Sequence, residues 1–346
     1  MVTDPTFVAV PERGALARIA LRTINDERDL PFLRLMALLS ALLIPAAVYI
    51  AWPGNFRWWM APPYLATIVF FVGPYILMLH NTSHRRLFNR RFGFMNHYIP
   101  WVLGPLFGES PETYFAHHVG MHHPENNLED DLSSTMKYQR DSFLDFMRYF
   151  LRFFFLALPD LATYFVRTKR PGLARRAVGG ELLFFAAAGA LAYVSWQGSL
   201  VVLVAPFVMA RFGMMAGNWG QHAFIDAATP ESCYRNSITC INCTYNRRCF
   251  NDGYHIGHHI KQTRHWTEMP PDFLANKQTY YDERAIVFEG IDFFMVWLFL
   301  MLKRYDWLAK RYVHLGPESE RKSLAEIEAL LRERTRQIPA RVLVAA

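Results

Sequence analysis

The runs LMALLSALLIPAAVYIAW (residues 35–52) and WWMAPPYLATIVFFVGPYILML (residues 58–79) decide the fold class, because neither contains a charged residue. A helix rises about 1.5 Å per residue, so each run is long enough to cross a hydrocarbon core about 30 Å thick. Only residues 53–57 separate the two runs. This spacing predicts two membrane-spanning helices joined as a tight hairpin.

Basic residues gather at the open ends of this hairpin. Its short loop holds only Arg57, whereas nine arginines lie beyond the two ends: Arg13, Arg18, Arg22, Arg28 and Arg34 before it, and Arg85, Arg86, Arg90 and Arg91 after it. Lys and Arg accumulate on the cytoplasmic side of membrane proteins. We therefore expect a cytoplasmic N-terminal segment, residues 1–34, and a cytoplasmic location for the chain that follows residue 79.

A second uncharged stretch covers residues 182–210 and is interrupted by Gln197, Gly198 and Ser199. It is compatible with one span and a tail, or with a second hairpin. The hairpin is favoured because 29 uncharged residues exceed the roughly 20 that one crossing needs. The expected fold is all-α, with four transmembrane helices in two hairpins and a cytoplasmic helical cap; the expected spans are residues 35–52, 58–79, 178–196 and 199–217.

Other segments are less regular. Residues 143–166 and 286–302 are apolar but carry charges, and we interpret them as helices lying in the membrane interface. Residues 94–107 are short and broken by prolines, which is typical of a re-entrant or buried segment. Residues 317–338 have the pattern of a charged amphipathic helix. We divide the chain into the N-terminal segment, a membrane domain (residues 35–305) and a cytoplasmic helical tail (residues 306–346).

Composition limits the function classes. Hydrophobic residues make up 52% of the 346 residues and charged residues only 19%, which excludes a disordered chain. The formal charge of +7 favours anionic lipid or an acidic partner over nucleic acid here, because apolar runs accompany it. The four cysteines lie between Cys233 and Cys249 and no secretory pattern begins the sequence, so we expect free structural thiols rather than disulfides.

Histidines are grouped in a pattern that predicts metal binding. The sequence contains HNTSH at residues 80–84, HHVGMHH at 117–123, NWGQH at 218–222 and HIGHH at 255–259. Residues four apart lie on one face of a helix, so each such pair offers two donors to one centre. Neighbours such as His122 and His123 point about 100° apart and can serve two metals. The candidate ligands are His80, His84, His118, His122, His123, Asn218, His222, His255, His258 and His259.

A lone histidine is more often an ordinary core or surface residue than a ligand, and we interpret His97, His265 and His314 in that way. His117 is a candidate for contact with the ligands rather than with the metal. Glu112, Asp226 and Asp252 are candidates for orienting the ligating imidazoles. Imidazole binds zinc, copper, iron and nickel alike, so the ligand type does not name the metal. Nine histidines are too many for one closed structural zinc site, and HExxH is absent.

These boxes resemble the three histidine boxes of the integral-membrane fatty acid desaturase and hydroxylase superfamily, in the family's order, and Asn218-x-x-x-His222 resembles its further ligand motif. The resemblance covers about residues 30–305. It implies a four-span fold with both hairpins opening to the cytoplasm, so that both termini and the active site are cytoplasmic. It also implies two non-haem irons held by the nine histidines named above, with Asn218 bound to iron directly or through water.

The resemblance implies O₂-dependent oxidation of an unactivated C–H bond in a long-chain fatty acid or acyl lipid at the bilayer. Desaturation is favoured; hydroxylation and oxidative decarboxylation to a terminal alkene use the same site. No haem, flavin or nucleotide motif appears, so an external donor of ferredoxin, rubredoxin or cytochrome b5 type is expected. The non-enzyme alternative is a metal transporter or sensor, which the absence of His, Asp and Glu from residues 35–52 and 58–79 disfavours.

Overall fold

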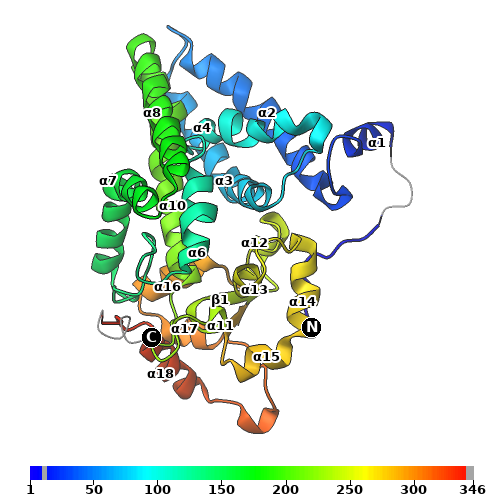
Figure 1. Cartoon of the computed structure of the whole chain (residues 1–346), viewed down its shortest axis with the longest axis vertical. Helices are drawn as coiled ribbons and strands as arrows, with labels where there is room; N and C mark the ends of the chain where they lie inside the picture. The colour runs from blue at the N-terminus through cyan, green and yellow to red at the C-terminus, as the bar shows by residue number, and fades with distance from the viewer. Residues whose placement is uncertain (10–13, 340–346) are drawn as a thin grey trace. The chain divides into compact units, whose positions relative to one another are not determined.

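The computed structural model describes residues 1–9 and 14–339, which form two compact units (Figure 1). Unit 1 comprises Met1–Thr6, Met121–Ala157 and Gly213–Ala346, and unit 2 comprises Phe7–Gly120 and Leu158–Phe212. Arg13 and the end of the predicted tail, residues 340–346, lie outside the described residues. The chain is mainly helical, as expected, with one small sheet.

Most of the long apolar helices lie in unit 2, but the helix at Phe143–Arg167 begins in unit 1 and the helix at Ala205–Gln221 ends in it. The first hairpin consists of α2 (Leu30–Ala51) and α3 (Ala61–His84). The second uncharged stretch is divided at Ser195: α8 (Pro171–Val194) ends before this residue, and α9 (Trp196–Ser199) begins after it. A one-turn π-helix at Leu200–Val204 then leads into α10 (Ala205–Gln221). The structure thus confirms that this stretch forms two helices rather than one.

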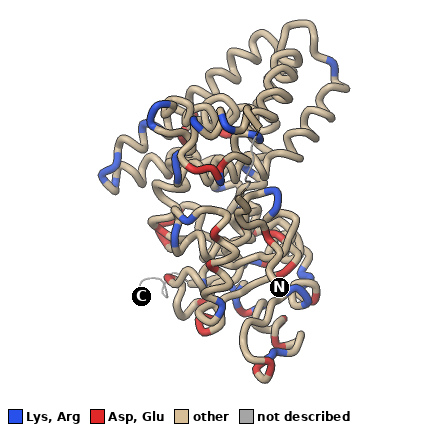
Figure 2. The backbone as a smooth tube through the Cα atoms, turned by 90° about the vertical axis from the view of Figure 1, so that its right-hand side faces the viewer, with Lys and Arg blue, Asp and Glu red and all other residues tan. Residues whose placement is uncertain are grey.

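Shorter elements complete unit 2. They are α1 (Ala15–Leu21), α4 (Gly104–Leu106) and α5 (Thr113–His117), with 3₁₀ turns at Glu27–Asp29, Trp58–Met60 and Arg90–His97 and a π turn at Ile99–Leu103. In Figure 2 the long helices are tan along most of their length, so charged residues are concentrated near their ends and in the connections. This distribution fits helices whose middle portions face lipid.

Within residues 1–9 and 14–339, five helices are long and apolar enough to cross a membrane. Four correspond to the predicted spans: Glu27–Ala51, Trp58–His84, Pro171–Val194 and Trp196–Gln221. The fifth is α7 (Phe143–Arg167), which the sequence suggested as an interfacial helix. These apolar helices identify a membrane protein. The length and composition of α7 are compatible with a membrane-spanning helix and with an interfacial one.

Unit 1 combines short helices with a two-stranded parallel sheet. Strands β1 (Ile238–Ile241) and β2 (Ile286–Glu289) pair with Ile238 opposite Ile286. The helices are α6 (His123–Glu125), α11 (Cys233–Asn236), α12 (Thr244–Arg248), α13 (His255–Ile260), α14 (Met269–Ala275), α15 (Lys277–Asp282), α16 (Phe293–Met301), α17 (Tyr305–Ala309) and α18 (Leu324–Arg334). Short 3₁₀ turns lie at Trp266–Glu268 and Glu318–Glu320.

The prediction of one helix over residues 286–302 is wrong. Its first part is β2, and its second part is α16. Gly290 has a φ of 73°, which a helix does not accept, and Asp292 then caps α16 by accepting a hydrogen bond from the Met295 amide. The break therefore comes from a left-handed glycine followed by a helix cap.

The core of unit 1 surrounds this sheet. Ile238, Cys240 and Phe288 are buried against Phe224 and Leu300, which belong to the segment after α10 and to α16. Close packing of this kind fixes the strand β1 and the loop that follows it. Since α13 follows β1 after one short helix, the sheet also positions the third histidine box.

Candidate metal centre

Four histidines converge within unit 1. His122 lies at the end of the segment after α5, His222 directly follows α10, and His255 and His259 lie one turn apart on α13. All four are buried, and one nitrogen of each lies within 4.8 Å of the others. The Nε2 atom of His255 lies 3.2 Å from that of His222 and 3.0 Å from that of His259. We call these residues the four-histidine cluster.

The Nδ1 atoms of two members face acceptors outside the cluster. His122 Nδ1 lies 2.6 Å from Asp131 Oδ2, and His222 Nδ1 lies 2.9 Å from the Asn236 carbonyl oxygen. An acceptor at Nδ1 holds the proton there, so the Nε2 lone pair is available to a metal. Burial, with a smaller effect of His122, lowers the pKa of His222 to about 4, which keeps this imidazole neutral at pH 7.

Asp131 is a buried partner of His122 that the sequence did not reveal. Its carboxylate is buried and also accepts hydrogen bonds from the Asn127 amide and from the Ser133 amide and hydroxyl. These donors fix its orientation toward His122. In the sequence, Asp131 is one of several acidic residues in the loop after the second histidine box. It does not lie three or four residues from His122, so helical spacing does not predict their contact.

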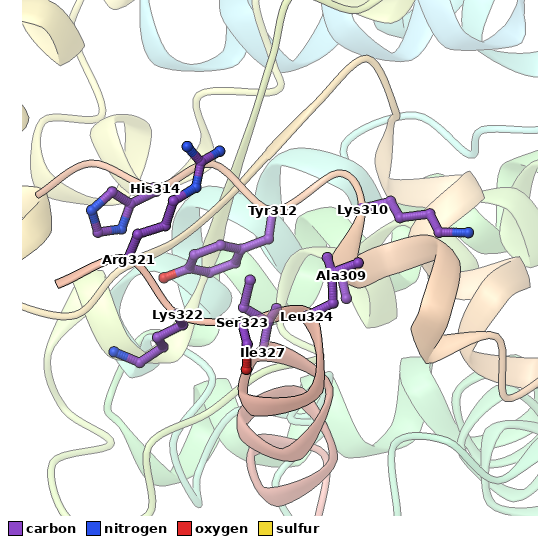
Figure 3. A pocket seen from close by; sticks show the side chains of 9 residues that line it. All are labelled: Ala309, Lys310, Tyr312, His314, Arg321, Lys322, Ser323, Leu324 and Ile327. Carbon is purple, nitrogen blue, oxygen red and sulfur yellow. The ribbon is translucent and has the colours of Figure 1, made fainter. Parts of the chain in front are cut away.

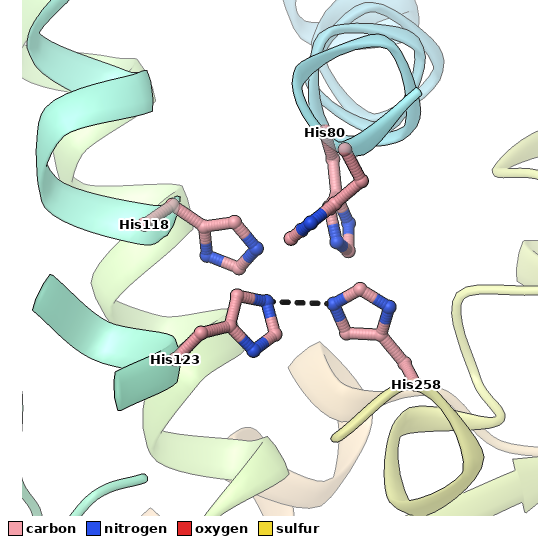
Figure 4. A group of neighbouring side chains, drawn as sticks. His80, His118, His123 and His258 are labelled. Carbon is pink, nitrogen blue, oxygen red and sulfur yellow. Dashed lines mark hydrogen bonds between the residues drawn. The ribbon is translucent and has the colours of Figure 1, made fainter. Parts of the chain in front are cut away.

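A second group of histidines lies in unit 2. His80 and His84 are one turn apart at the end of α3, and His118 follows α5. The ring centroid of His80 lies 5.2 Å from that of His84 and 4.6 Å from that of His118, and His84 and His118 are 5.2 Å apart. Figure 4 includes His80 and His118. We call these residues the three-histidine cluster.

His123 and His258 form a further pair within unit 1. Their Nε2 atoms lie 2.9 Å apart, as the dashed line in Figure 4 marks. Both residues are buried. His123 thus has a different partner from its neighbour His122, as the 100° rotation between adjacent helical residues predicted.

One pairing expected from the sequence is wrong. His118 and His122 were expected to serve one centre because they are four residues apart. The structure places His118 in the three-histidine cluster and His122 in the four-histidine cluster. Residues His118–His122 form a π-helix, in which hydrogen bonds join residues five apart and each turn is wider than in an α-helix. The four-residue rule therefore does not apply to this segment.

Asn218 lies one turn before His222 on α10. Its amide nitrogen donates hydrogen bonds to the Ser133 carbonyl oxygen, at 3.0 Å, and to the Tyr149 hydroxyl, at 2.8 Å. Rotating the amide by 180° would place Oδ1 against that carbonyl oxygen, so the contact fixes the orientation. Asn218 Oδ1 has no hydrogen-bond partner within residues 1–9 and 14–339, and remains available as an acceptor.

The remaining candidates have other partners. Glu112 accepts hydrogen bonds from Trp101 and Arg176, Asp226 pairs with Arg334, and Asp252 accepts from Tyr245 and Gln221. His265 Nδ1 contacts the Thr267 hydroxyl, and His314 Nε2 contacts the Pro317 carbonyl oxygen. These contacts agree with the interpretation of His265 and His314 as structural residues rather than metal ligands.

The four cysteines are free thiols. Cys240, Cys243 and Cys249 are buried, and burial raises the pKa of each, that of Cys243 to about 12. The three buried thiols pack as small apolar groups. The expectation of free thiols rather than disulfides is confirmed.

The donor set fits a bound metal ion. Two imidazole nitrogens that are each about 2.1 Å from one ion are at most about 4.2 Å apart. The largest separation in the four-histidine cluster is bounded by 4.8 Å, so shifts of a few tenths of an ångström would complete a metal site. Four imidazoles suit a first-row transition metal better than calcium or magnesium, which prefer oxygen ligands.

Comparison with known proteins agrees with this chemistry. The family model for fatty acid desaturases matches residues 56–291, which is more than half of the chain. No curated protein and no solved structure matches the chain. The matched region contains every histidine of the two clusters and the His123–His258 pair. The chain belongs to the fatty acid desaturase family.

Proposed function

We propose that this protein is a membrane-bound, O₂-dependent di-iron enzyme that desaturates a long-chain fatty acid or acyl lipid. The observation that carries the proposal is the four-histidine cluster, whose buried imidazoles converge in a member of the desaturase family. Bound iron would supply the oxidising power to remove hydrogen from an unactivated C–H bond, which amino-acid side chains cannot provide.

We assign the ligands to two irons. His122, His222, His255 and His259 hold one iron, and Asn218 Oδ1 faces it directly or through water. We also assign His80, His84 and His118, and the His123–His258 pair, to iron ligation. The support for these assignments is that the first three imidazoles converge within unit 2 and the other two lie against each other within unit 1.

The protein's own residues have defined tasks in this proposal. Asp131 and the Asn236 carbonyl oxygen hold protons at Nδ1 of His122 and His222, which directs each Nε2 inward. The Ser133 carbonyl oxygen and Tyr149 orient the Asn218 amide. The apolar helices of unit 2 provide the lipid-facing surface from which an acyl chain enters, and burial of the imidazoles excludes water.

We infer the topology from the same pattern. The four predicted spans form two hairpins with both termini and the metal centre in the cytoplasm, and α7 lies in the interface. The positive-inside distribution of arginines supports this arrangement. The division into an N-terminal segment (1–34), a desaturase domain (35–305) and a cytoplasmic tail (306–346) belongs to this proposal.

The electron donor is an external acidic protein of ferredoxin, rubredoxin or cytochrome b5 type. In support, unit 1 carries a pocket of about 340 Å³ that is lined by Lys310, His314, Arg321 and Lys322 (Figure 3). Lys310 and Lys322 form no ion pair within the described part of the chain. Unpaired cations on a surface steer acidic partners toward it.

The test is expression in a host that lacks the activity, followed by analysis of lipids and headspace volatiles. New unsaturated chains that disappear in the His258→Ala variant support desaturation. Hydroxylated chains or volatile terminal alkenes instead would assign one of the alternative reactions. Purified, iron-reconstituted protein that retains less than one iron per chain would overturn the di-iron assignment, whereas retained zinc alone would favour a transporter or sensor.

A further inference from the structure

A buried hydrogen-bond network inside unit 1 joins two members of the four-histidine cluster. Its centre is Asn127, in the loop after the second histidine box, and all polar groups of this residue form hydrogen bonds. The backbone amide donates to Asp131 Oδ2, at 2.9 Å, and the backbone carbonyl oxygen accepts from Ser134 Oγ, at 2.6 Å. In the side chain, Oδ1 accepts from the Thr135 amide, at 2.9 Å, and Nδ2 donates to Asn236 Oδ1, at 2.7 Å. We call Asn127, Asp131, Thr135 and Asn236 the Asn127 network.

The orientation of both side-chain amides in this network is determined by their partners. The Thr135 amide nitrogen can only donate, so it must face the oxygen of Asn127 rather than its nitrogen. Asn236 Nδ2 donates to the Asn126 carbonyl oxygen, which can only accept, and this leaves Asn236 Oδ1 toward Asn127. A rotation of either amide by 180° would oppose like groups, so the link has a single arrangement.

One arm of the network leads to His122. The Asp131 oxygen that accepts from the Asn127 amide also lies 2.6 Å from His122 Nδ1. Asn127 has a φ of 60°, in the left-handed region that asparagine tolerates better than most residues. The backbone of Asn127 therefore helps to hold the carboxylate that orients one imidazole.

Two further arms lead to His222. Asn236, which accepts from the Asn127 side chain, holds the His222 ring through its own carbonyl oxygen, 2.9 Å from Nδ1. Thr135, whose amide donates to Asn127, donates its hydroxyl to the His222 carbonyl oxygen, at 2.7 Å. All four residues are 0% exposed, so water does not compete for these hydrogen bonds. The ring and the backbone of His222 are thus both anchored to direct partners of Asn127.

We propose that Asn127 is a positioning residue that orients His122 and His222 together for metal binding. This inference rests on the metal-binding part of the proposed function. The hydrogen bonds of Asn127 go to neither imidazole, so it acts through Asp131 on one ligand and through Asn236 and Thr135 on the other. Because these residues form one network, a change at Asn127 alters the placement of both donors.

The test measures Co(II) binding by the purified full-length protein in detergent, because the visible absorption of bound cobalt reports the geometry of its ligands. The variant is Asn127→Gly. Glycine accepts the left-handed backbone and keeps the amide and carbonyl hydrogen bonds, so only the two side-chain bonds are lost. The matched control is Asn126→Gly, because Asn126 has a φ of 49° and its side chain contacts the carbonyl oxygen of the exposed Glu231.

We expect Asn127→Gly to bind Co(II) about 10- to 100-fold more weakly than the wild type. Its visible spectrum should be shifted even when the protein is saturated with cobalt, whereas Asn126→Gly should match the wild type in affinity and spectrum. A loss of stability alone would leave the spectrum of the fully loaded protein unchanged, so this readout separates positioning from core packing. A saturated Asn127→Gly spectrum identical to that of the wild type overturns the proposal.

A second pair of variants, Thr135→Val and Thr135→Ser, tests the network even if Asn127→Gly does not fold. Valine has the shape of threonine and keeps the amide that donates to Asn127, but it lacks the hydroxyl that donates to the His222 carbonyl oxygen. Serine restores that hydroxyl. We expect a shifted cobalt spectrum in Thr135→Val and a spectrum close to that of the wild type in Thr135→Ser. Identical spectra in the two variants overturn the proposal.

Failure of the proposed function gives different results. A wild-type protein that binds no cobalt would overturn the metal centre and this inference with it. A wild-type protein that binds cobalt, loads iron and yet forms no oxidised lipid would overturn the proposed reaction alone, while the spectral shift in Asn127→Gly would still support the positioning role.

Discussion

The Nδ1 atom of His122 lies 2.6 Å from Oδ2 of Asp131, and both side chains are buried. This contact connects the second histidine box to the loop that follows it. An imidazole held in this way presents Nε2 to a metal in one tautomer and one orientation.

Asp131→Asn is expected to weaken metal binding. The amide has almost the same size but no charge, and its nitrogen can turn toward His122 and favour the wrong tautomer. Loss of such outer partners costs about 10- to 100-fold in metal affinity. Titration of the purified protein with Fe(II), read by metal analysis after desalting, measures the effect. Asp130→Asn at the exposed neighbouring position is the control, and equal iron retention by both variants would contradict the role of Asp131.

Tyr149→Phe is expected to loosen the Asn218 amide without removing it. The amide nitrogen then keeps only the Ser133 carbonyl oxygen as acceptor, and the hydrogen bond from the Tyr149 hydroxyl to that carbonyl oxygen is lost as well. Loss of these two hydrogen bonds destabilises the fold by about 2 kcal/mol. We expect normal iron content but an altered iron spectrum by Mössbauer spectroscopy. Asn218→Ala should reproduce the spectral change. If the Asn218→Ala spectrum were identical to that of the wild type, the proposed interaction of Asn218 with the iron would be wrong.

Arg140→Lys is expected to destabilise unit 1 by about 3 kcal/mol. The buried guanidinium donates to the carbonyl oxygens of Ala223, Arg334 and Arg336, among others, and an ammonium group cannot reach them together. Denaturant unfolding followed by Trp fluorescence measures the loss. The free energy of unfolding of the exposed control Arg148→Lys should stay within about 0.5 kcal/mol of the wild type. Equal losses of stability in the two variants would contradict the stabilising role of Arg140.

The contribution of Glu109 to the stability of the protein should fall as the pH rises from about 4.5 to about 8. Burial raises the pKa of Glu109 from 4.5 to about 8, so the folded state binds more protons than the unfolded state in this window. The stabilising proton is fully bound below the unfolded value and lost above the folded one. Glu109→Gln should flatten this dependence by a few kcal/mol, as thermal unfolding at several pH values would reveal. A slope unchanged by the substitution would contradict it.

Replacing both Lys310 and Lys322 by Glu should raise the KM for an acidic electron donor severalfold. Both residues line the basic pocket and are exposed, and rim charges act mainly on association. Steady-state turnover at several salt concentrations tests this prediction. The wild type should slow as salt increases, because salt screens exposed charges, and the variant should respond less. Salt-independent turnover in both proteins would contradict donor docking here.

Local patterns predicted much of this molecule. The uncharged runs around residues 35–79 and 182–210 identified four long helices, because hydropathy and length depend on the segment alone. The grouping of His80 with His84, and of His255 with His259, followed from α-helical spacing. In both cases the relevant neighbours lie within one turn of one another.

Long-range or irregular features could not be predicted. The π-helix at His118–His122 separates two histidines that an α-helix would align. The pairing of β1 with β2 joins short apolar segments distant in the sequence. Asp131 and Glu109 resemble ordinary loop carboxylates in the sequence, and only their burial distinguishes them. Each feature depends on tertiary packing that one segment does not encode.

Unit 1 is assembled from separated parts of the chain, Met1–Thr6, Met121–Ala157 and Gly213–Ala346. His259 is the last member of the four-histidine cluster in the sequence. The cluster is therefore complete only after the ribosome has synthesised His259. By then the last candidate span, which ends at Gln221, has already emerged. Metal loading is consequently a late step of biogenesis, and nascent chains halted before His255 should reach the bilayer without retaining iron at that cluster.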